Sequence, residues 1–160
     1  MKRHPSLRDL SVDHHHALVQ AHRLQKAVDA DAQTQQSTFD DFARFWREHT
    51  GPHFREEEEA LLPFFARYGD VDEEPIRQMQ REHILMRRDA ALLFALGAAD
   101  TSTRNGAMQA LGRQLEAHVR LEERVVFPLI EEALPEEALS HLPAVLAAWR
   151  HEAGLPPHTE

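Results

Sequence analysis

Apolar residues recur three and four positions apart along most of the chain, which is the spacing of amphipathic helices. The alternation that is typical of half-buried strands is nearly absent. The pattern predicts five helices, at about residues 11–31, 38–67, 72–96, 103–133 and 136–150. Ser11 or Asp13 is expected near the start of the first helix, and the polar segments Asp31–Ser37 and Asp100–Gly106 are expected to be loops.

Four long helices joined by short polar connections predict an all-α fold, namely an up-down-up-down four-helix bundle with a short extra C-terminal helix. The length of 160 residues suits one domain with a sizeable core. We expect this domain to span residues 1–150, and a loose C-terminal tail with Pro156 and Pro157 to span residues 151–160.

Three prolines interrupt the second and fourth predicted helices. Pro52 follows Gly51 and is expected at a break or bend, where it suits the first turn of a restarted helix. Pro63 and Pro128 each remove a backbone donor, so each is expected to bend its helix. They stand at the same place in two similar segments, which indicates a shared structural role.

Those two segments are copies of one eleven-residue pattern. Each begins with a histidine, carries a glutamate four residues later and ends with a proline: His53, Glu57 and Pro63 in one, and His118, Glu122 and Pro128 in the other. On a helix, residues four apart lie on one face with Cβ atoms about 5–6 Å apart. Each copy therefore presents an imidazole beside a carboxylate, and two copies that face each other would form a site for two metal ions.

Each copy and the helix before it form one predicted helical hairpin, and that preceding helix contributes a further histidine. His14 and His83 each follow an acidic residue, and apolar residues lie seven and four positions before them and seven and ten positions after them. Both histidines therefore belong to an apolar stripe that faces the core. His15 and His16 are rotated about 100° and about 200° from His14, so His14 is the favoured ligand and His15 the reserve.

The charged neighbours of these residues are expected to have other roles. Asp13 and Glu82 precede the two histidines and point away from them, which favours helix capping or surface contacts. Three glutamates and three histidines are expected to be solvated: Glu56, Glu58, Glu59, His4, His151 and His158. His49 lies one turn before His53 and is a candidate pocket residue, whereas a contact of His22 with the site stays open.

The composition narrows the partners and the chemistry. The chain has no cysteine, so any metal must be held by nitrogen and oxygen. The formal net charge of −9 argues against nucleic acid or an anionic membrane as a partner. No secretory signal is visible, and the apolar stretch Ala90–Ala99 is too short to span a bilayer, so a cytoplasmic location is expected.

Four imidazoles and two carboxylates in a helical core suit iron, manganese or zinc. To bury them without a cation would be costly, and two glutamates from opposite hairpins can each bridge two ions. A dinuclear centre is therefore favoured. The ferritin-like bundles use a Glu-x-x-His signature instead, and that signature does not occur in this chain.

The order Asp-His, His-x-x-x-Glu, Glu-His, His-x-x-x-Glu resembles the hemerythrin family in its bacterial cation-binding HHE form, over about residues 5–135. The resemblance implies a four-helix bundle around two non-haem iron ions joined by an oxo or hydroxo bridge. The ligand set that it implies is His14, His53, Glu57, His83, His118 and Glu122. Such a set leaves roughly one exchangeable position on each octahedral iron.

One position departs from the oxygen-carrying members of that family. They have a fifth histidine one turn after the third-helix ligand, where this chain has Arg87. The set of four histidines and two glutamates is closer to hemerythrin-like sensors and to di-iron proteins of iron–sulfur cluster repair. Those repair proteins also have a cysteine-bearing N-terminal segment, which this chain lacks.

The sequence therefore predicts a di-iron protein that binds or senses dioxygen, nitric oxide or another small oxidant. A di-iron redox enzyme, of an oxidase, peroxidase or damage-repair type, is the first alternative, and a metal store is the second. A sensing role calls for a separate signalling or redox partner protein, because no output domain is visible. The predicted helix at about 136–150 either caps the bundle or forms a homodimer contact.

Overall fold

The computed structural model describes residues 3–97 and 100–158, and this part of the chain is helical without strands. The first helical run is a short 3-10 turn, Pro5–Leu7, followed by α1 (Arg8–Ala27). The second run consists of α2 (Ala32–Phe45), η2 (Trp46–Thr50), α3 (Gly51–Glu56), η3 (Glu57–Leu61) and α4 (Leu62–Phe65). The remaining elements are α5 (Glu74–Leu96), α6 (Thr101–Leu121), η4 (Glu122–Val126), α7 (Phe127–Ala133) and α8 (Glu136–Glu152). Residues 159 and 160 of the expected tail lie outside the described residues.

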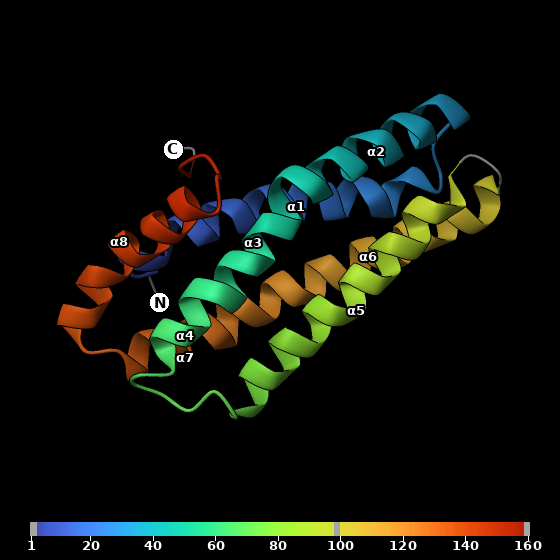
Figure 1. Ribbon diagram of the computed structural model, residues 1–160. Coiled ribbons are helices and arrows are strands. Elements are labelled where there is room, and N and C mark those ends of the chain that lie inside the picture. Colours follow the sequence, from blue (N-terminus) through green and yellow to red (C-terminus); the bar gives the residue numbers. More distant parts are fainter. Residues whose placement is uncertain (1–2, 98–99, 159–160) are drawn as a thin grey trace.

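The long helical runs lie alongside one another, and α8 packs at the end of the molecule where the N-terminus lies (Figure 1). The backbones of α1 and α6 approach each other closely at Gly112. A Cβ atom built on Gly112 would lie 2.7 Å from the backbone oxygen of Ala21. Glycine is therefore required there, because a larger residue would push the two helices apart.

Two helices begin earlier than the polar composition of the chain suggests. The Asp31 carboxylate accepts a hydrogen bond from the Thr34 amide at 2.9 Å, and α2 begins at the next residue. Asp100 accepts from the Thr103 amide at 3.0 Å in the same way. The expected loops Asp31–Ser37 and Asp100–Gly106 are therefore mostly helical, since an N-terminal capping carboxylate outweighs a polar composition.

The start of the first helix is also earlier than expected. Helix α1 begins at Arg8, so Ser11 and Asp13 lie inside it and do not cap it. The 3-10 turn before it is capped by His4, whose ring accepts from the Ser6 amide at 3.2 Å. This cap lies upstream of the polar residues that the pattern singled out.

The prolines of the second and fourth helical runs are accommodated by π-helical turns. The amide of Gly51 donates to the Trp46 carbonyl, that of Leu62 to the Glu57 carbonyl, and that of Phe127 to the Glu122 carbonyl. Each of these amides directly precedes a proline, which cannot donate a hydrogen bond. The helix thus continues through Gly51 and Pro52 instead of breaking, and matching π turns begin at Glu57 and Glu122.

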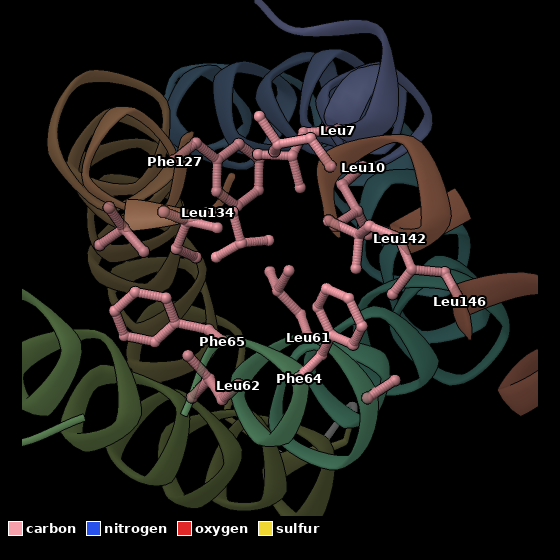
Figure 2. Close-up of a cluster of buried hydrophobic side chains, with 14 of the residues drawn as sticks. Leu7, Leu10, Leu61, Leu62, Phe64, Phe65, Phe127, Leu134, Leu142 and Leu146 are labelled. Atoms are coloured by element: carbon pink, nitrogen blue, oxygen red, sulfur yellow. The ribbon is translucent and has the colours of Figure 1, made fainter. Parts of the chain in front are cut away.

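Two groups of buried apolar side chains fill the interior. The first lies beneath α8 and is drawn in Figure 2; it includes Leu7, Leu10, Leu61, Phe65, Phe127 and Leu142. The second includes Leu24, Phe42, Phe54, Met86, Leu93 and Leu115. Along α1, Leu10 belongs to the first group and Ala17 to the second, so His14 lies at the boundary between them. The same boundary falls at His83 on α5.

In the described residues, no helix is both long enough and apolar enough to cross a membrane.

Candidate metal centre

The six residues singled out by the sequence meet at the boundary between the two apolar groups. Each side chain comes from a helical turn, and all six residues are buried: His14 in α1, His53 in α3, Glu57 in η3, His83 in α5, His118 in α6 and Glu122 in η4. The structure thus brings together residues that are up to about a hundred positions apart in the sequence. A π turn begins at each of the two glutamates.

One half of the centre is formed by His14 and His53, whose Nε2 atoms lie 3.0 Å apart. The Nε2 atom of His14 lies 2.9 Å from Oε2 of Glu122, and that of His53 lies 3.3 Å from Oε1 of Glu57. We refer to this group as the His14–His53 half. Two nitrogens and one oxygen of each glutamate converge there.

The other half repeats this arrangement with His83 and His118, whose Nε2 atoms are also 3.0 Å apart. The Nε2 atom of His118 lies 2.9 Å from Oε1 of Glu122, and that of His83 lies 3.4 Å from Oε2 of Glu57. We refer to this group as the His83–His118 half. Each glutamate therefore directs one carboxylate oxygen toward each half, which is the arrangement that a bridging carboxylate requires.

These donors match a pair of metal ions. All four carboxylate oxygens of Glu57 and Glu122 are buried and form no hydrogen bond, which would be costly without a cation. Two ligand atoms about 2.1 Å from the same octahedral ion lie about 3.0 Å apart when they are adjacent. The separations within the two halves are 2.9–3.4 Å, which is close to that value, except for the 3.9 Å between Nε2 of His14 and Oε1 of Glu57. Both halves could hold a metal ion, and the donor set of imidazole nitrogen and carboxylate oxygen suits a transition metal.

Each of the four histidines also faces a second carboxylate through its Nδ1 atom. The pairs are His14 with Glu123 at 2.6 Å, His53 with Asp13 at 3.3 Å, His83 with Glu58 at 2.8 Å, and His118 with Glu82 at 2.8 Å. A carboxylate accepts a hydrogen bond from Nδ1–H, which keeps the proton on Nδ1 and leaves the Nε2 lone pair free for a metal. The four outer carboxylates therefore orient every imidazole toward the centre.

Sequence reasoning missed these outer carboxylates, although the repeat contains them. Asp13 and Glu82 both precede a histidine, and each serves the histidine of the next helical run in its own hairpin. Glu58 and Glu123 both follow a bridging glutamate, and each serves a histidine of the other hairpin. The signal was therefore present as matched acidic positions in both copies. A helical wheel showed correctly that Asp13 points away from His14, but it could not show a neighbouring helix.

Several residues that were expected at the surface are buried, because spacing within one helix does not show which other helices pack against it. Glu58 is half-buried between His83 and Arg87, and Glu56 is fully buried against Arg150. Only Glu59 of this acidic run is exposed as expected. Arg87, which stands where oxygen carriers have a fifth histidine, donates to both oxygens of Glu58 at 2.8 and 2.9 Å. The arginine therefore braces the carboxylate that orients His83.

The remaining histidines lie outside the two halves. His15, His16, His22 and His49 are exposed. His49 stacks on Phe45 with ring centroids 4.9 Å apart, and it lines a cavity beside the centre together with His16. His151 is exposed as expected. His158 was also expected to be solvated, but this is wrong, since its side chain is largely buried between Asp13 and Glu56.

A small cavity reaches the His14–His53 half from outside. It has a volume of about 20 Å³, which is room for about one water-sized molecule. Its walls include His14, His53, His118 and Glu122 of the centre and the apolar residues Ala17, Phe45, Phe54, Leu115 and Val119. Thr50 also lines it, and its buried hydroxyl oxygen has no hydrogen-bond partner. Both histidines of the His14–His53 half line the cavity, whereas His118 is the histidine of the other half that lines it, and His83 does not.

Without a metal, protonated imidazoles balance the buried carboxylates. Burial disfavours the charged form of His53, but Glu57 and Asp13 outweigh it and raise its pKa well above the usual value. For His83, burial is likewise outweighed by Glu122, Glu57 and Glu58, which raise its pKa to about 10. Burial also opposes the charge on Glu122, yet His118 and the other histidines hold its pKa well below its ordinary value. Metal binding would therefore release protons.

Comparison with known proteins gives one match. A family model for the hemerythrin HHE cation binding domain matches residues 6–130 and, in a second alignment, residues 75–152. The second alignment begins at the start of α5, the helix that precedes the second copy of the repeat. No curated protein and no solved structure matches the chain. The longer match covers most of the chain, and the chain belongs to the hemerythrin HHE cation-binding domain family.

Proposed function

We propose that this chain holds two non-haem iron ions, one in each half of the centre. The observation that carries the proposal is the division of both buried glutamates: Glu57 and Glu122 each direct one oxygen to either histidine pair. Such a division calls for two cations, because a single ion would leave two imidazoles and two carboxylate oxygens unmatched in the core. Manganese or zinc are the alternative metals for these donors.

Each residue of the centre has a defined role in this proposal. The two bridging positions belong to Glu57 and Glu122, and the four terminal nitrogens belong to His14, His53, His83 and His118. The ions would supply small-ligand binding and one-electron redox chemistry. The protein residues orient the nitrogens, exclude bulk water and admit small molecules to the His14–His53 half.

The function that this geometry supports best is the binding or sensing of dioxygen, nitric oxide or another small oxidant. The cavity has room for about one water-sized molecule, which suits a diatomic ligand and excludes an organic substrate. The free Thr50 hydroxyl on its wall is a donor for such a ligand. A redox enzyme is the second candidate, and it would need electrons from a separate partner protein.

The proposal includes the arrangement of the helices that carry the centre. We infer that α1, the run from α2 to α4, α5, and the run from α6 to α7 form an up-down-up-down four-helix bundle, and that α8 is the short extra helix. The Nε2 atoms project from all four runs into the space between the two apolar groups. A bundle supplies ligands from facing helices in this manner.

Anaerobic reconstitution with ferrous iron, followed by metal analysis and exposure to air, tests the function. We expect two irons per chain and a visible absorption band that appears with the small ligand. A band that disappears when the ligand is removed supports binding, whereas continuing consumption of a reductant supports the enzyme. A single iron per chain that is retained when Glu57 and Glu122 are both replaced would overturn the dinuclear proposal.

A further inference from the structure

The four outer carboxylates of the centre are each held in place by a further residue. Arg3 donates to Glu123 at 2.9 Å, Gln78 donates to Glu82 at 2.8 Å, and Arg87 donates to Glu58. Asp13 is different, since its further partner is His158, from the segment after α8. The orientation of His53 therefore depends on a residue more than a hundred positions away.

His158 lies between two carboxylates. Its Nδ1 atom is 3.2 Å from Oδ2 of Asp13, at ion-pair distance but without the alignment of a hydrogen bond, and its Nε2 atom is 2.9 Å from Oε1 of Glu56 in a hydrogen bond. The same Oδ2 atom of Asp13 lies 3.3 Å from Nδ1 of His53. One carboxylate oxygen is thus placed between the imidazole of His158 and the imidazole of His53.

The segment that carries His158 is fixed by contacts with α8 and α3. Gly154, at a φ of 68°, turns the chain back after α8, and glycine adopts this left-handed conformation without strain. Arg150 donates through Nε to the Pro156 carbonyl at 2.7 Å and through Nη1 to Oε2 of Glu56 at 2.6 Å. The side chain of His158 is only 10% exposed as a result.

Asp13, Glu56 and His158 could either bind a further cation or balance one another's charges, and their charges decide between these two roles. Burial disfavours the charged form of His158, but Asp13 and Glu56 outweigh it and raise its pKa to about 9, so the ring is a cation at neutral pH. Together with Arg150, it neutralises the two carboxylates. Asp13, Glu56 and His158 lie close enough to hold a metal ion, but an added cation would have to displace a charge that is already matched.

We propose that His158 is a positioning residue for the metal centre: through Asp13 it holds the His53 imidazole with its Nε2 atom toward the metal. The inference rests on the proposed di-metal function for its consequence, although the contact itself exists in the metal-free protein. It makes the C-terminal segment part of the His14–His53 half. The other half depends on residues of the long helices alone, namely Gln78 and Arg87.

Two substitutions separate positioning from simple anchoring of the segment. In H158N the amide nitrogen takes the place of Nδ1 and retains the contact with Asp13. In H158Q the amide nitrogen takes the place of Nε2 and retains the contact with Glu56. H158A removes both contacts, and the control is H151A, an exposed histidine at the end of α8.

The first measurement is zinc affinity by competition with a chelator, together with the number of ions bound. Loss of a residue that orients a ligand costs about 10- to 100-fold in metal affinity. We expect a loss in that range for one of the two ions in H158A and H158Q. H158N and H151A should bind both ions like the wild type, and all four variants should show the unfolding midpoint of a folded protein.

The second measurement needs no metal: the Nδ1–H proton of His53 in the metal-free protein, followed by nuclear magnetic resonance. It should exchange slowly with solvent in the wild type and in H158N, and faster in H158A and H158Q. Equal behaviour of H158N and H158Q in both measurements would overturn positioning in favour of anchoring.

Two further results have separate meanings. A third zinc ion in the wild type that is lost in H158A would overturn positioning in favour of an accessory cation site. Fewer than two ions in the wild type would refute the proposed function. The proton measurement would still decide whether His158 positions His53.

Discussion

The two halves of the candidate metal centre have equal donors and unequal surroundings. Each half has two imidazoles and one oxygen from each glutamate, and each has a phenylalanine stacked on one imidazole. The cavity, however, is lined by both histidines of the His14–His53 half and by His118 alone of the other pair. The outer carboxylates of that half are held by Arg3 and His158, from the two ends of the chain.

A symmetric set of donors thus has asymmetric surroundings. The repeat dictates the ligands and the outer carboxylates, so these are alike in the two halves. The cavity and the residues that hold the outer carboxylates come from outside the repeat, so these features differ between the two halves. We therefore expect a small molecule to bind at the His14–His53 half and the His83–His118 half to serve as the enclosed, less exchangeable site.

The largest expected effect is a loss of metal binding when the two glutamates that both halves share are replaced. Replacement of Glu57 and Glu122 together by alanine takes away all four carboxylate oxygens that face the two histidine pairs. We expect metal content to fall from two ions per chain to none, measured by elemental analysis after dialysis. Glu59→Ala is the matched control, because Glu59 is exposed and faces Arg55. Retention of both ions by the double variant would show that the histidines suffice.

The next largest effect is a loss of stability when the phenylalanine beside His83, in the His83–His118 half, is replaced. The Phe54 ring is 1% exposed and stacks on His83 with centroids 3.9 Å apart and an interplanar angle of 12°. Phe54→Ala should lower the free energy of unfolding by about 3–5 kcal/mol, because it leaves a cavity in the core. Urea denaturation of the metal-free protein measures this loss.

Phe127 offers the comparison on the open half. Its ring stacks on His14 with centroids 5.1 Å apart, and it is also fully buried. Phe127→Ala should therefore cost a similar amount, about 3–5 kcal/mol. A loss below about 1 kcal/mol for either variant would mean that the ring contributes little to that half.

The sequence predicted which residues meet at the candidate centre better than it predicted what surrounds them. Spacing along one helix fixes which residues share a face, so the pairing of His53 with Glu57 and the choice of His14 over His15 followed from periodicity. The partners of Nδ1 lie on other helices, and no spacing within one helix indicates them. The place of His158 depends on the turn at Gly154, which sequence periodicity does not describe.

The helix ends show the same limit. Polar segments at 31–37 and 100–106 were expected to be loops, but capping by Asp31 and Asp100 starts a helix within each. The prolines were expected to bend helices, and the structure absorbs them in π turns that begin at Glu57 and Glu122. Both outcomes depend on backbone hydrogen bonds, which composition does not reveal.

A further prediction concerns a substitution that fills the cavity and so tests the difference in access. Ala17 lies on the cavity wall and is 8% exposed, and a leucine there would fill the space for the small ligand. Ala17→Leu should weaken binding of azide or nitric oxide to the loaded protein by at least about tenfold, or about 1.4 kcal/mol. The protein should still bind two ions.

Optical titration measures this effect, and Ala91→Leu on the exposed face of α5 is the control. Equal ligand affinity in Ala17→Leu and in the wild type would place ligand entry elsewhere. It would also remove the main distinction between the halves.

The smallest expected effect is the pH dependence of the His158 contacts. The pKa of His158 is about 9 in the folded protein and near 6.5 in the unfolded chain, because Asp13 and Glu56 favour the charged ring. The stability that these contacts contribute is therefore fully present below about pH 6.5 and is lost as the pH rises through about 9. The free energy of unfolding of wild type minus H158A should be positive at about pH 6 and smaller at about pH 10.

Urea denaturation at the two pH values measures that difference, and H151A should show none. If the difference between wild type and H158A were the same at both pH values, the ring would act through packing and not through charge. The open half would then be braced at Asp13 by shape alone, whereas Arg3 would hold Glu123 by charge. Its two outer carboxylates would be held by different forces.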